Sequence, residues 1–266
     1  MPTAYGNYHN YNGPASRFPG FPPSSHVRDA RLTMLESLVP GLFTAKHCLD
    51  IGCNAGTVSC QLAVDFEATS VTGVDIDSSL VNQAENLLAL RSSRVRPPIA
   101  ESSKPIVDYF PVSAVLTHGY RVEPASKTSR SSPAAPALPL LPRVNFIAAD
   151  FVLSADPAIS GPYDVILALS VIKWIHLEHL DKGLVTFFQK CSSSLASGGY
   201  FVIELQTWDS YERAIRPTTA PHFRESLAQL KLRPETSFDE ILQEHGLQLH
   251  KTCDSLPRRI SVYRKV

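Results

Sequence analysis

The amino-acid sequence predicts an α/β fold with a mostly parallel seven-stranded sheet, helices on both faces and a terminal antiparallel hairpin. Three observations predict it. Short apolar segments rich in Val and Ile alternate with segments of helical periodicity, which is typical of parallel strands joined by crossover helices. A glycine-containing turn follows the first apolar segment. The last two apolar segments are separated only by a short turn, which favours an antiparallel hairpin.

The N-terminal part of the chain is expected to hold an irregular arm, three helices and two strands. Residues 1–25 are rich in Tyr, Asn, Gly and Pro, and we interpret them as an aromatic arm that covers the active site. Apolar residues recur at helical spacing over residues 27–43, up to a break at Pro40-Gly41. The next elements predicted are strands at residues 48–51 and 70–76 and helices at residues 57–66 and 78–91.

The alternation stops between residues 92 and 143. Nine prolines interrupt this stretch, mixed with Ser and Ala, so it lacks both periodicity and a continuous apolar face. We predict a disordered insertion with at most a short ordered piece near residues 106–116. A linker between domains is the alternative, but neither flank resembles a complete domain alone.

The alternation resumes after the insertion and continues to the C-terminus. Residues 26–266 are therefore predicted to form one domain that contains the insertion. The elements expected are strands at residues 144–148, 163–169 and 200–205, helices at residues 181–195, 222–232 and 237–246, and closing strands at residues 247–254 and 259–264.

Composition limits the functional classes. The formal net charge is zero, which argues against a protein that wraps a long nucleic acid, although a short contact with one end is compatible. The five cysteines form no C-x-x-C pair, so we expect core or loop thiols and no metal site. No apolar run is long enough to span a membrane, and no signal peptide is evident. A monomer in the cytosol or nucleus is expected.

The turn after the first strand reads Asp50-Ile51-Gly52-Cys53-Asn54-Ala55-Gly56. In an open α/β sheet, ligands bind at the carboxyl ends of the strands, where this turn lies. Gly52 and Gly56 lack Cβ atoms and allow close approach to a ligand. Asp50 can fix the loop or attract an ammonium group, and the amides around Cys53 and Asn54 can bind a cofactor.

Two details favour a methyl donor over a nicotinamide cofactor, although a nicotinamide enzyme stays possible. The G-x-G-x-x-G spacing is absent. Asp75 ends the second strand, where a carboxylate can accept both ribose hydroxyls of an adenosine, with Asp77 beside the next helix; a metal pair is the alternative reading. Asp150-Phe151 follows the third strand, either as an adenine contact or as an ordinary turn. The pattern predicts a Rossmann-like class I methyltransferase that uses S-adenosyl-L-methionine.

Three further segments are not explained by cofactor binding. They are Y-G-N-Y at residues 5–8, L-S-V-I-K-W-I-H-L at residues 169–177 and E-L-Q-T-W-D-S-Y at residues 204–211. Together with D-I-G-C-N-A-G and G-V-D-I-D, they resemble the RNA methylphosphate capping enzymes, the bicoid-interacting-protein-3 family. The resemblance covers residues 5–211, interrupted by the insertion. Departures are Asp150-Phe151, where the family commonly has Asn-Tyr, and residues 14–16, which are additional before Arg17.

The resemblance implies methyl transfer to an oxygen of the 5′-terminal (γ-)phosphate of a small noncoding RNA, in the nucleus and with a La-related protein as partner. It assigns catalysis to Tyr5 and Lys173. With the residues of the glycine turn, the cofactor set is Tyr5, Arg17, Asp50, Gly52, Cys53, Asn54, Gly56, Asp75, Ile76, Asp150, Phe151 and Leu169; the RNA 5′-phosphate set is Tyr5, Tyr8, Lys173, Gln206, Trp208 and Tyr211.

Alternatives stay open at this stage. By itself, Lys173 is more often a solvated lysine on a loop, Trp174 a core residue and His176 a partner of a local carbonyl. A 5′-monophosphate or another small oxygen acceptor is a second enzymatic hypothesis. A cofactor-binding RNA chaperone that stabilises a ribonucleoprotein without turnover belongs to a different class.

Overall fold

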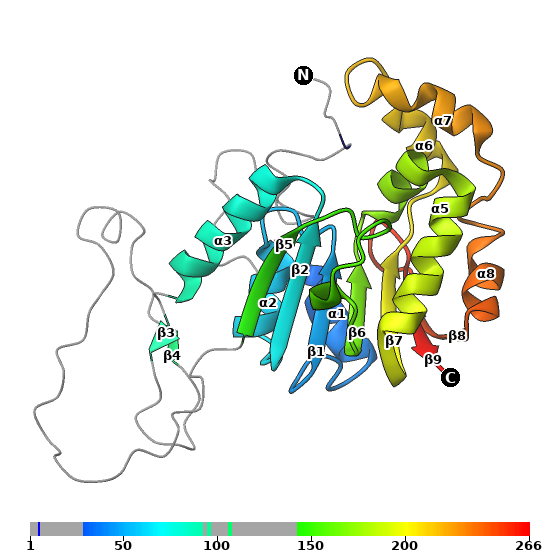
Figure 1. Ribbon diagram of the computed structural model, residues 1–266. Coiled ribbons are helices and arrows are strands. Elements are labelled where there is room, and N and C mark those ends of the chain that lie inside the picture. The colour runs from blue at the N-terminus through cyan, green and yellow to red at the C-terminus, as the bar shows by residue number, and fades with distance from the viewer. Residues whose placement is uncertain (1–4, 6–28, 93–94, 97–105, 108–142) are drawn as a thin grey trace, which may run out of the picture.

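Seven strands form one central sheet in the order β5-β2-β1-β6-β7-β9-β8 (Figure 1). The computed structural model describes residues 5, 29–92, 95–96, 106–107 and 143–266. The first five strands of that order are parallel, whereas β9 runs antiparallel to β7 and β8 antiparallel to β9. The strands are β1 (His47–Ile51), β2 (Ser70–Asp75), β5 (Arg143–Ala148), β6 (Tyr163–Ala168), β7 (Leu195–Glu204), β8 (Leu247–Cys253) and β9 (Ile260–Lys265).

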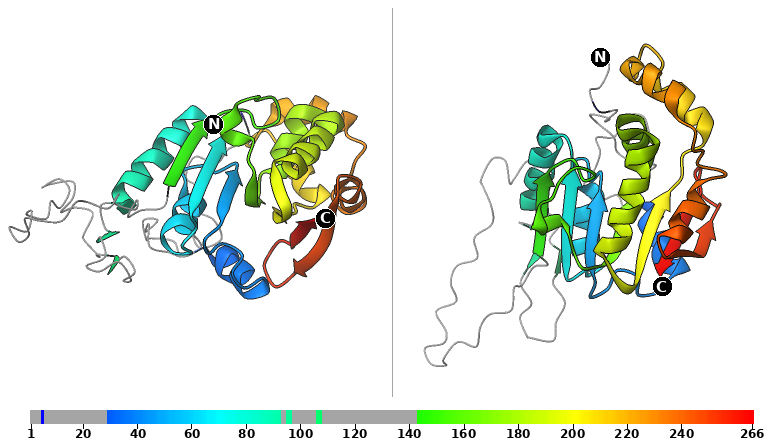
Figure 2. Two further views of the ribbon diagram at one scale, coloured as in Figure 1. Left: turned by 60° about the horizontal axis from the view of Figure 1, so that its bottom comes forward. Right: turned by 45° about the vertical axis from the view of Figure 1, so that its right-hand side comes forward.

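Helices cover both faces of this sheet, so the predicted fold class is confirmed. The helices α1 and α5 lie on opposite faces (Figure 2). The helices and 3-10 turns are α1 (Ala30–Leu38), α2 (Thr57–Val64), α3 (Ser78–Ser92), η2 (Pro157–Ile159), α5 (Ile172–Ser194), α6 (Trp208–Ala214), η3 (Pro221–Phe223), α7 (Arg224–Gln229) and α8 (Phe238–Glu244).

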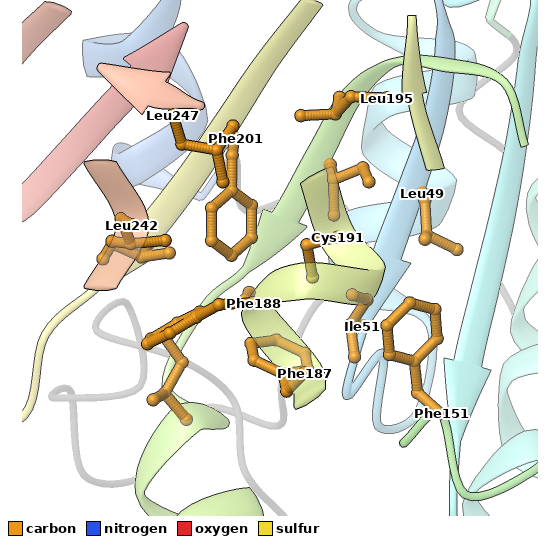
Figure 3. Packing of buried hydrophobic residues seen from close by; sticks show 14 of the residues in the cluster. Leu49, Ile51, Phe151, Phe187, Phe188, Cys191, Leu195, Phe201, Leu242 and Leu247 are labelled. Atoms are coloured by element: carbon orange, nitrogen blue, oxygen red, sulfur yellow. The ribbon is translucent and has the colours of Figure 1, made fainter. Parts of the chain in front are cut away.

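Strand alternation divides the apolar side chains between two layers. Leu49 and Ile51 pack with Phe187 and Phe188 of α5 on one face (Figure 3). Cys48, the residue before Leu49, packs with residues of α1 and α2 on the other face. Because successive side chains of a strand point to opposite faces, the buried residues of β1 supply both apolar layers. The two layers fix the carboxyl ends of the strands, which carry the site.

Two elements begin earlier than the sequence predicted. The helix α5 starts at Ile172 rather than at residue 181, and its backbone kinks at Leu180, where φ is 59° and ψ is −171°. The segment around Lys173 is therefore helical and is not a loop. Strand β7 starts at Leu195 rather than at residue 200, and an irregular register beside β6 accommodates the glycines that were interpreted as a helix stop.

The C-terminal helices also differ from the prediction. A short helix, α6, occupies the stretch after β7 and was not predicted. The helix expected at residues 222–232 is a 3-10 turn, η3, followed directly by α7. Both α6 and α7 lie beyond the carboxyl ends of the strands, at the top of Figure 1. They form a separate apolar cluster with the first half of α5.

Most of the predicted arm and insertion lies outside the described residues, and with it Tyr8 and Arg17. Of the arm, Tyr5 is described. Of the insertion, β3 (Val95–Arg96) and β4 (Ile106–Val107) are described as a small antiparallel pair. Within the described part of the chain, no helix is long and apolar enough to cross a membrane, and no cluster of three potential metal ligands occurs. All five cysteines are free thiols.

Candidate cofactor and acceptor site

A cavity of about 410 Å³ lies at the carboxyl ends of the parallel strands. A volume of this size suits a cofactor or a small ligand. Of the predicted cofactor residues, Gly56 does not line the cavity, and Arg17 lies outside the described residues. The others all line it: Tyr5, Asp50, Gly52, Cys53, Asn54, Asp75, Ile76, Asp150, Phe151 and Leu169.

The glycine turn is built by positive φ angles and by hydrogen bonds to β2. Gly52 has a φ of 73°, a conformation that favours glycine, and its amide donates to the Val74 carbonyl at 2.8 Å. The Cys53 amide donates to the same carbonyl at 3.1 Å, and the Asn54 amide to the Asp75 carboxylate at 2.8 Å. These amides thus fix the loop against β2.

Gly56 has a packing role in this structure. It is the N-cap residue of α2 with a φ of 78°. A Cβ atom there would lie 2.7 Å from the Ala84 Cβ and 2.9 Å from the Phe146 ring. The missing side chain therefore lets α2 approach α3 and β5 closely.

Asp50 is a buried carboxylate at the floor of the turn. Its side chain accepts a hydrogen bond from the Ser59 hydroxyl at 2.6 Å. Burial raises its pKa to about 6, against the lowering effects of Ser59 and the Arg31 charge. Asp50 is therefore ionised at neutral pH, and a buried anion favours a cationic partner such as the ammonium group of an amino-acid moiety.

Asp75 presents a carboxylate that suits a ribose diol. One oxygen accepts from the Asn54 amide at 2.8 Å, and the other accepts from the Asp77 amide at 3.0 Å. Each carboxylate oxygen has capacity for a further hydrogen bond. Burial raises the pKa of Asp75, and the two amides partly oppose that change. Asp77 accepts from the Ser79 amide at 2.8 Å, so it caps α3.

The turn after β5 forms a further part of the cavity wall near Asp75. Asp150 accepts from the amides of Val152 at 2.9 Å and Leu153 at 3.3 Å, and its second oxygen lies 2.9 Å from the His179 imidazole. Phe151 is buried and supplies an apolar face to the cavity. His179 also lines the cavity, and sequence reasoning missed it because it approaches Asp150 only through the fold.

A largely buried ionic cluster lies at the other end of the cavity, and all its members except Glu204 line it. Arg31 of α1 pairs with Asp29 at 2.6 Å and with Glu204 at the end of β7 at 2.7 Å. The Ser170 hydroxyl donates to Glu204 in a short hydrogen bond and accepts from Arg258 at 2.9 Å. Of this cluster, the sequence motifs contained Ser170 and Glu204 without a role, and they gave no signal for the others.

Lys173 does not line the cavity. It is 3% exposed, and its ammonium donates to the hydroxyl of Ser210 at 3.0 Å and to the carbonyl of the same residue at 3.3 Å. Burial lowers its pKa to about 7, with further lowering by Arg258 and Arg213. Gln206 does line the cavity, and its side-chain oxygen accepts from the Lys173 amide at 3.3 Å.

Trp208 and Tyr211, both predicted to meet RNA, lie in α6 outside the cavity lining. Tyr211 is 1% exposed, and its hydroxyl lies 3.3 Å from a ring nitrogen of His176. Its ring stacks on Trp208 with 5.1 Å between centroids, while the Arg233 guanidinium lies 3.4 Å from the Trp208 ring centroid. The indole is thus covered by side chains of the protein itself, and the RNA roles of both aromatics stay predictions.

The fold is shared with known methyltransferases. It is similar to that of the N-methyltransferase NodS of Bradyrhizobium japonicum WM9, with a TM-score of 0.52 and 14% sequence identity over 88% of this chain and 94% of that one. The sheet order, the glycine turn and the carboxylate that ends β2 define a class I methyltransferase, a class that uses S-adenosylmethionine. The predicted cofactor is confirmed at this level.

The chain belongs to the Bicoid-interacting protein 3 family. Residues 163–265 match that family. A probable RNA methyltransferase of Arabidopsis thaliana is 35% identical over 90% of this chain and 70% of its own length. The U6 snRNA methylphosphate capping enzyme of Drosophila melanogaster and the 7SK snRNA methylphosphate capping enzyme of Homo sapiens are each 32% identical over 90% and 98% of this chain.

The relatives differ in length and in their named acceptors. The chain spans 64% of the Drosophila relative and 39% of the human one. An RNA 5′-monophosphate methyltransferase of Bos taurus is 25% identical over 92% of this chain and 74% of its own length. The predicted family is therefore confirmed, while the acceptor of this chain follows from neither name alone.

Proposed function

We propose that this protein transfers a methyl group from S-adenosylmethionine to an oxygen of the 5′-terminal γ-phosphate of a small noncoding RNA. The observation that carries the proposal is the composition of the cavity. One end combines Asp50, Asp75 and apolar side chains, which suits the cofactor, and the other presents Arg258 and Gln206, which suit a phosphate. The names of the capping-enzyme relatives support the same acceptor.

The chemistry requires positioning rather than a strong base. S-adenosylmethionine, when bound, supplies a methyl group on a positively charged sulfur. A phosphate oxygen is anionic at neutral pH, so no side chain must remove a proton from it. Asp50 and Asp75 can hold the two polar ends of the cofactor, and Trp174 and Leu169 exclude water from the cavity wall. Orientation of this kind can contribute on the order of 7–11 kcal/mol to a barrier.

The catalytic roles predicted for Tyr5 and Lys173 enter this proposal in different ways. Tyr5 is 40% exposed and lines the cavity, so its hydroxyl can donate directly to a bound phosphate. Lys173 is held by Ser210, one layer behind the lining. We propose that it supports the acceptor end through its charge, since a partly buried cation attracts an anion over several ångströms.

The test uses labelled S-adenosylmethionine and one RNA prepared with a 5′-triphosphate, a 5′-monophosphate or a 5′-hydroxyl end. The proposal expects label on the triphosphate RNA and none on the hydroxyl RNA. Label that is retained on the hydroxyl RNA contradicts the phosphate acceptor altogether. Label on the monophosphate RNA alone favours the second candidate, which the Bos taurus relative supports. Tight RNA binding with no label on any end indicates the chaperone.

The cellular setting is proposed on the same basis. We infer a nuclear location and a La-related partner, as the resemblance of the sequence motifs to the capping enzymes implies. We also propose that the enzyme acts as a monomer. Fluorescence imaging of the tagged protein, co-purification and light scattering test these three points separately.

A further inference from the structure

We propose that Arg258 is the residue that binds the acceptor phosphate, with its guanidinium at the acceptor end of the cavity. This inference rests on the proposed function and adds to it a residue that the sequence motifs did not indicate. The ligand class is a terminal phosphate or polyphosphate, because that group presents several anionic oxygens at the separation of the guanidinium N–H donors.

A residue that binds the acceptor phosphate must reach the cavity, and Arg258 does. It lies just before β9 and lines the cavity, while its side chain stays 38% exposed. The guanidinium is oriented by the Ser170 hydroxyl, which accepts from it at 2.9 Å. Ser170 follows β6 by two residues and has a φ of 64°, so a strained backbone position places this hydroxyl at the cavity wall.

The neighbouring carboxylate, Glu204, leaves hydrogen-bond donors of the Arg258 guanidinium available. Glu204 is committed to Arg31 at 2.7 Å and to Ser170, whereas its closest approach to Arg258 is 3.7 Å. An arginine has five N–H donors, and one of them is given to Ser170 here. Glu204 and Ser170 therefore act as positioning residues, and the guanidinium keeps donors for an anion in the cavity.

A second and independent observation is the proximity of like charges. The charges of Arg258 and Arg213 lower the pKa of Lys173 beyond the effect of burial. The hydrogen bonds of the Lys173 ammonium go to Ser210, an uncharged residue. Glu204 pairs with Arg31 at 2.7 Å and lies 3.7 Å from Arg258, so it offsets only part of this repulsion, and a phosphate anion would relieve the rest. Protein phosphate sites are built in this way.

The test compares Arg258→Gln, Arg258→Lys and the matched control Arg259→Gln. Arg259 is the next residue, carries the same charge, and its guanidinium lies 3.8 Å from Asp239 and outside the cavity lining. For each variant, KM and kcat are measured with 5′-triphosphate RNA, and the Kd of S-adenosylhomocysteine is measured by calorimetry. Binding of 5′-triphosphate and 5′-hydroxyl RNA of one sequence is measured by anisotropy with S-adenosylhomocysteine present, so that no turnover occurs.

The expected result is a loss confined to the phosphate. Arg258→Gln lowers kcat/KM about tenfold to a hundredfold, mainly through KM, as expected for charge-assisted hydrogen bonds. It removes the preference for 5′-triphosphate over 5′-hydroxyl RNA and leaves the S-adenosylhomocysteine Kd within about twofold of wild type. Arg258→Lys restores part of the loss, and Arg259→Gln behaves as wild type.

Three results would overturn the inference. Arg258→Gln could match Arg259→Gln in KM and in end preference, or it could lose cofactor affinity as much as RNA affinity. The wild type could also bind 5′-triphosphate and 5′-hydroxyl RNA equally. Failure of the proposed function gives a different result. In that case the wild type prefers the 5′-triphosphate end and Arg258→Gln loses this preference, but neither protein methylates any RNA. The phosphate site would then exist without the reaction.

Discussion

Replacement of Lys173 by methionine should stabilise the protein at neutral pH. The lysine is 3% exposed, and its ammonium hydrogen-bonds to Ser210 rather than to a carboxylate. Burial, together with Arg258 and Arg213, lowers its pKa from 10.5 to about 7. Methionine has a similar length and no charge, so Lys173→Met removes the cost of burying the ammonium while it fills the same space.

The size of the effect follows from proton linkage. Between pH 7 and 10.5 the unfolded chain binds more protons at this site than the folded chain, so the free energy of unfolding rises with pH. Each tenfold difference in proton affinity corresponds to about 1.4 kcal/mol. The lysine therefore costs about 4 kcal/mol at pH 7 and about 2 kcal/mol at pH 9, an upper range because the lost hydrogen bonds to Ser210 offset part of it.

The assay is urea unfolding of wild type and Lys173→Met at several values between pH 7 and 9, without RNA. The difference in unfolding free energy between the two proteins cancels the titration of all other groups. It should favour the variant at pH 7 and shrink by about 2 kcal/mol towards pH 9. Lys173→Arg serves as the control that keeps the charge. Parallel pH profiles for wild type and Lys173→Met would refute the reasoning, because the lysine would then titrate as an exposed one.

Three further substitutions test the site and its support. Gly52→Ala should lower S-adenosylhomocysteine affinity, measured by calorimetry, at least about tenfold. The φ of 73° costs an L-residue about 1–2 kcal/mol, and the added Cβ would lie 2.5 Å from the Val171 side chain. Unchanged affinity would contradict the close packing. Asp75→Asn should weaken the same ligand by about 1.5–3 kcal/mol. Thermal stability is measured alongside, because the NH2 group that replaces one carboxylate oxygen faces a backbone N–H donor and loosens the turn. Asp181→Ala should destabilise the fold by about 1–3 kcal/mol, because it frees His176 and two amides. The Asp181 pKa is lowered by these partners against the raising effect of burial, so this stability is present at neutral pH and is lost in acid; an equal loss at pH 3 and 7 would contradict the assignment.

The sheet could be predicted because its signals are local. Apolar runs followed by turns identified all seven strands, and the cofactor turn followed from its glycines. The start of β7 was missed because Gly198 and Gly199 resemble a helix stop, whereas an irregular pairing between β6 and β7 carries them within the strand. The first half of α5 was missed because its apolar residues continue the run of β6, and tertiary contacts decide between the two structures.

The cofactor end of the site could also be predicted, and the acceptor end could not. Asp50 and Asp75 lie in the last two residues of the parallel strands β1 and β2, where position in the sequence determines position at the carboxyl edge of the sheet. Arg31, Ser170 and Arg258 come from a helix start, a strand end and a turn that are up to 227 positions apart in sequence. Only folding brings them together, and single-sequence patterns contain no signal for such non-local pairs.

The kinked helix α5 has a thermodynamic consequence. Its first turn carries Lys173 beside the acceptor end, and His179, just before the kink, meets Asp150 at the adenosine end. One helix thus contacts both ends of the cavity, and a shift of its axis alters both at once. Any cooperativity transmitted through α5 must be reciprocal: the factor by which bound cofactor strengthens RNA binding equals the factor by which RNA strengthens cofactor binding. Release of either product, S-adenosylhomocysteine or methylated RNA, would then lower the affinity of the protein for the other.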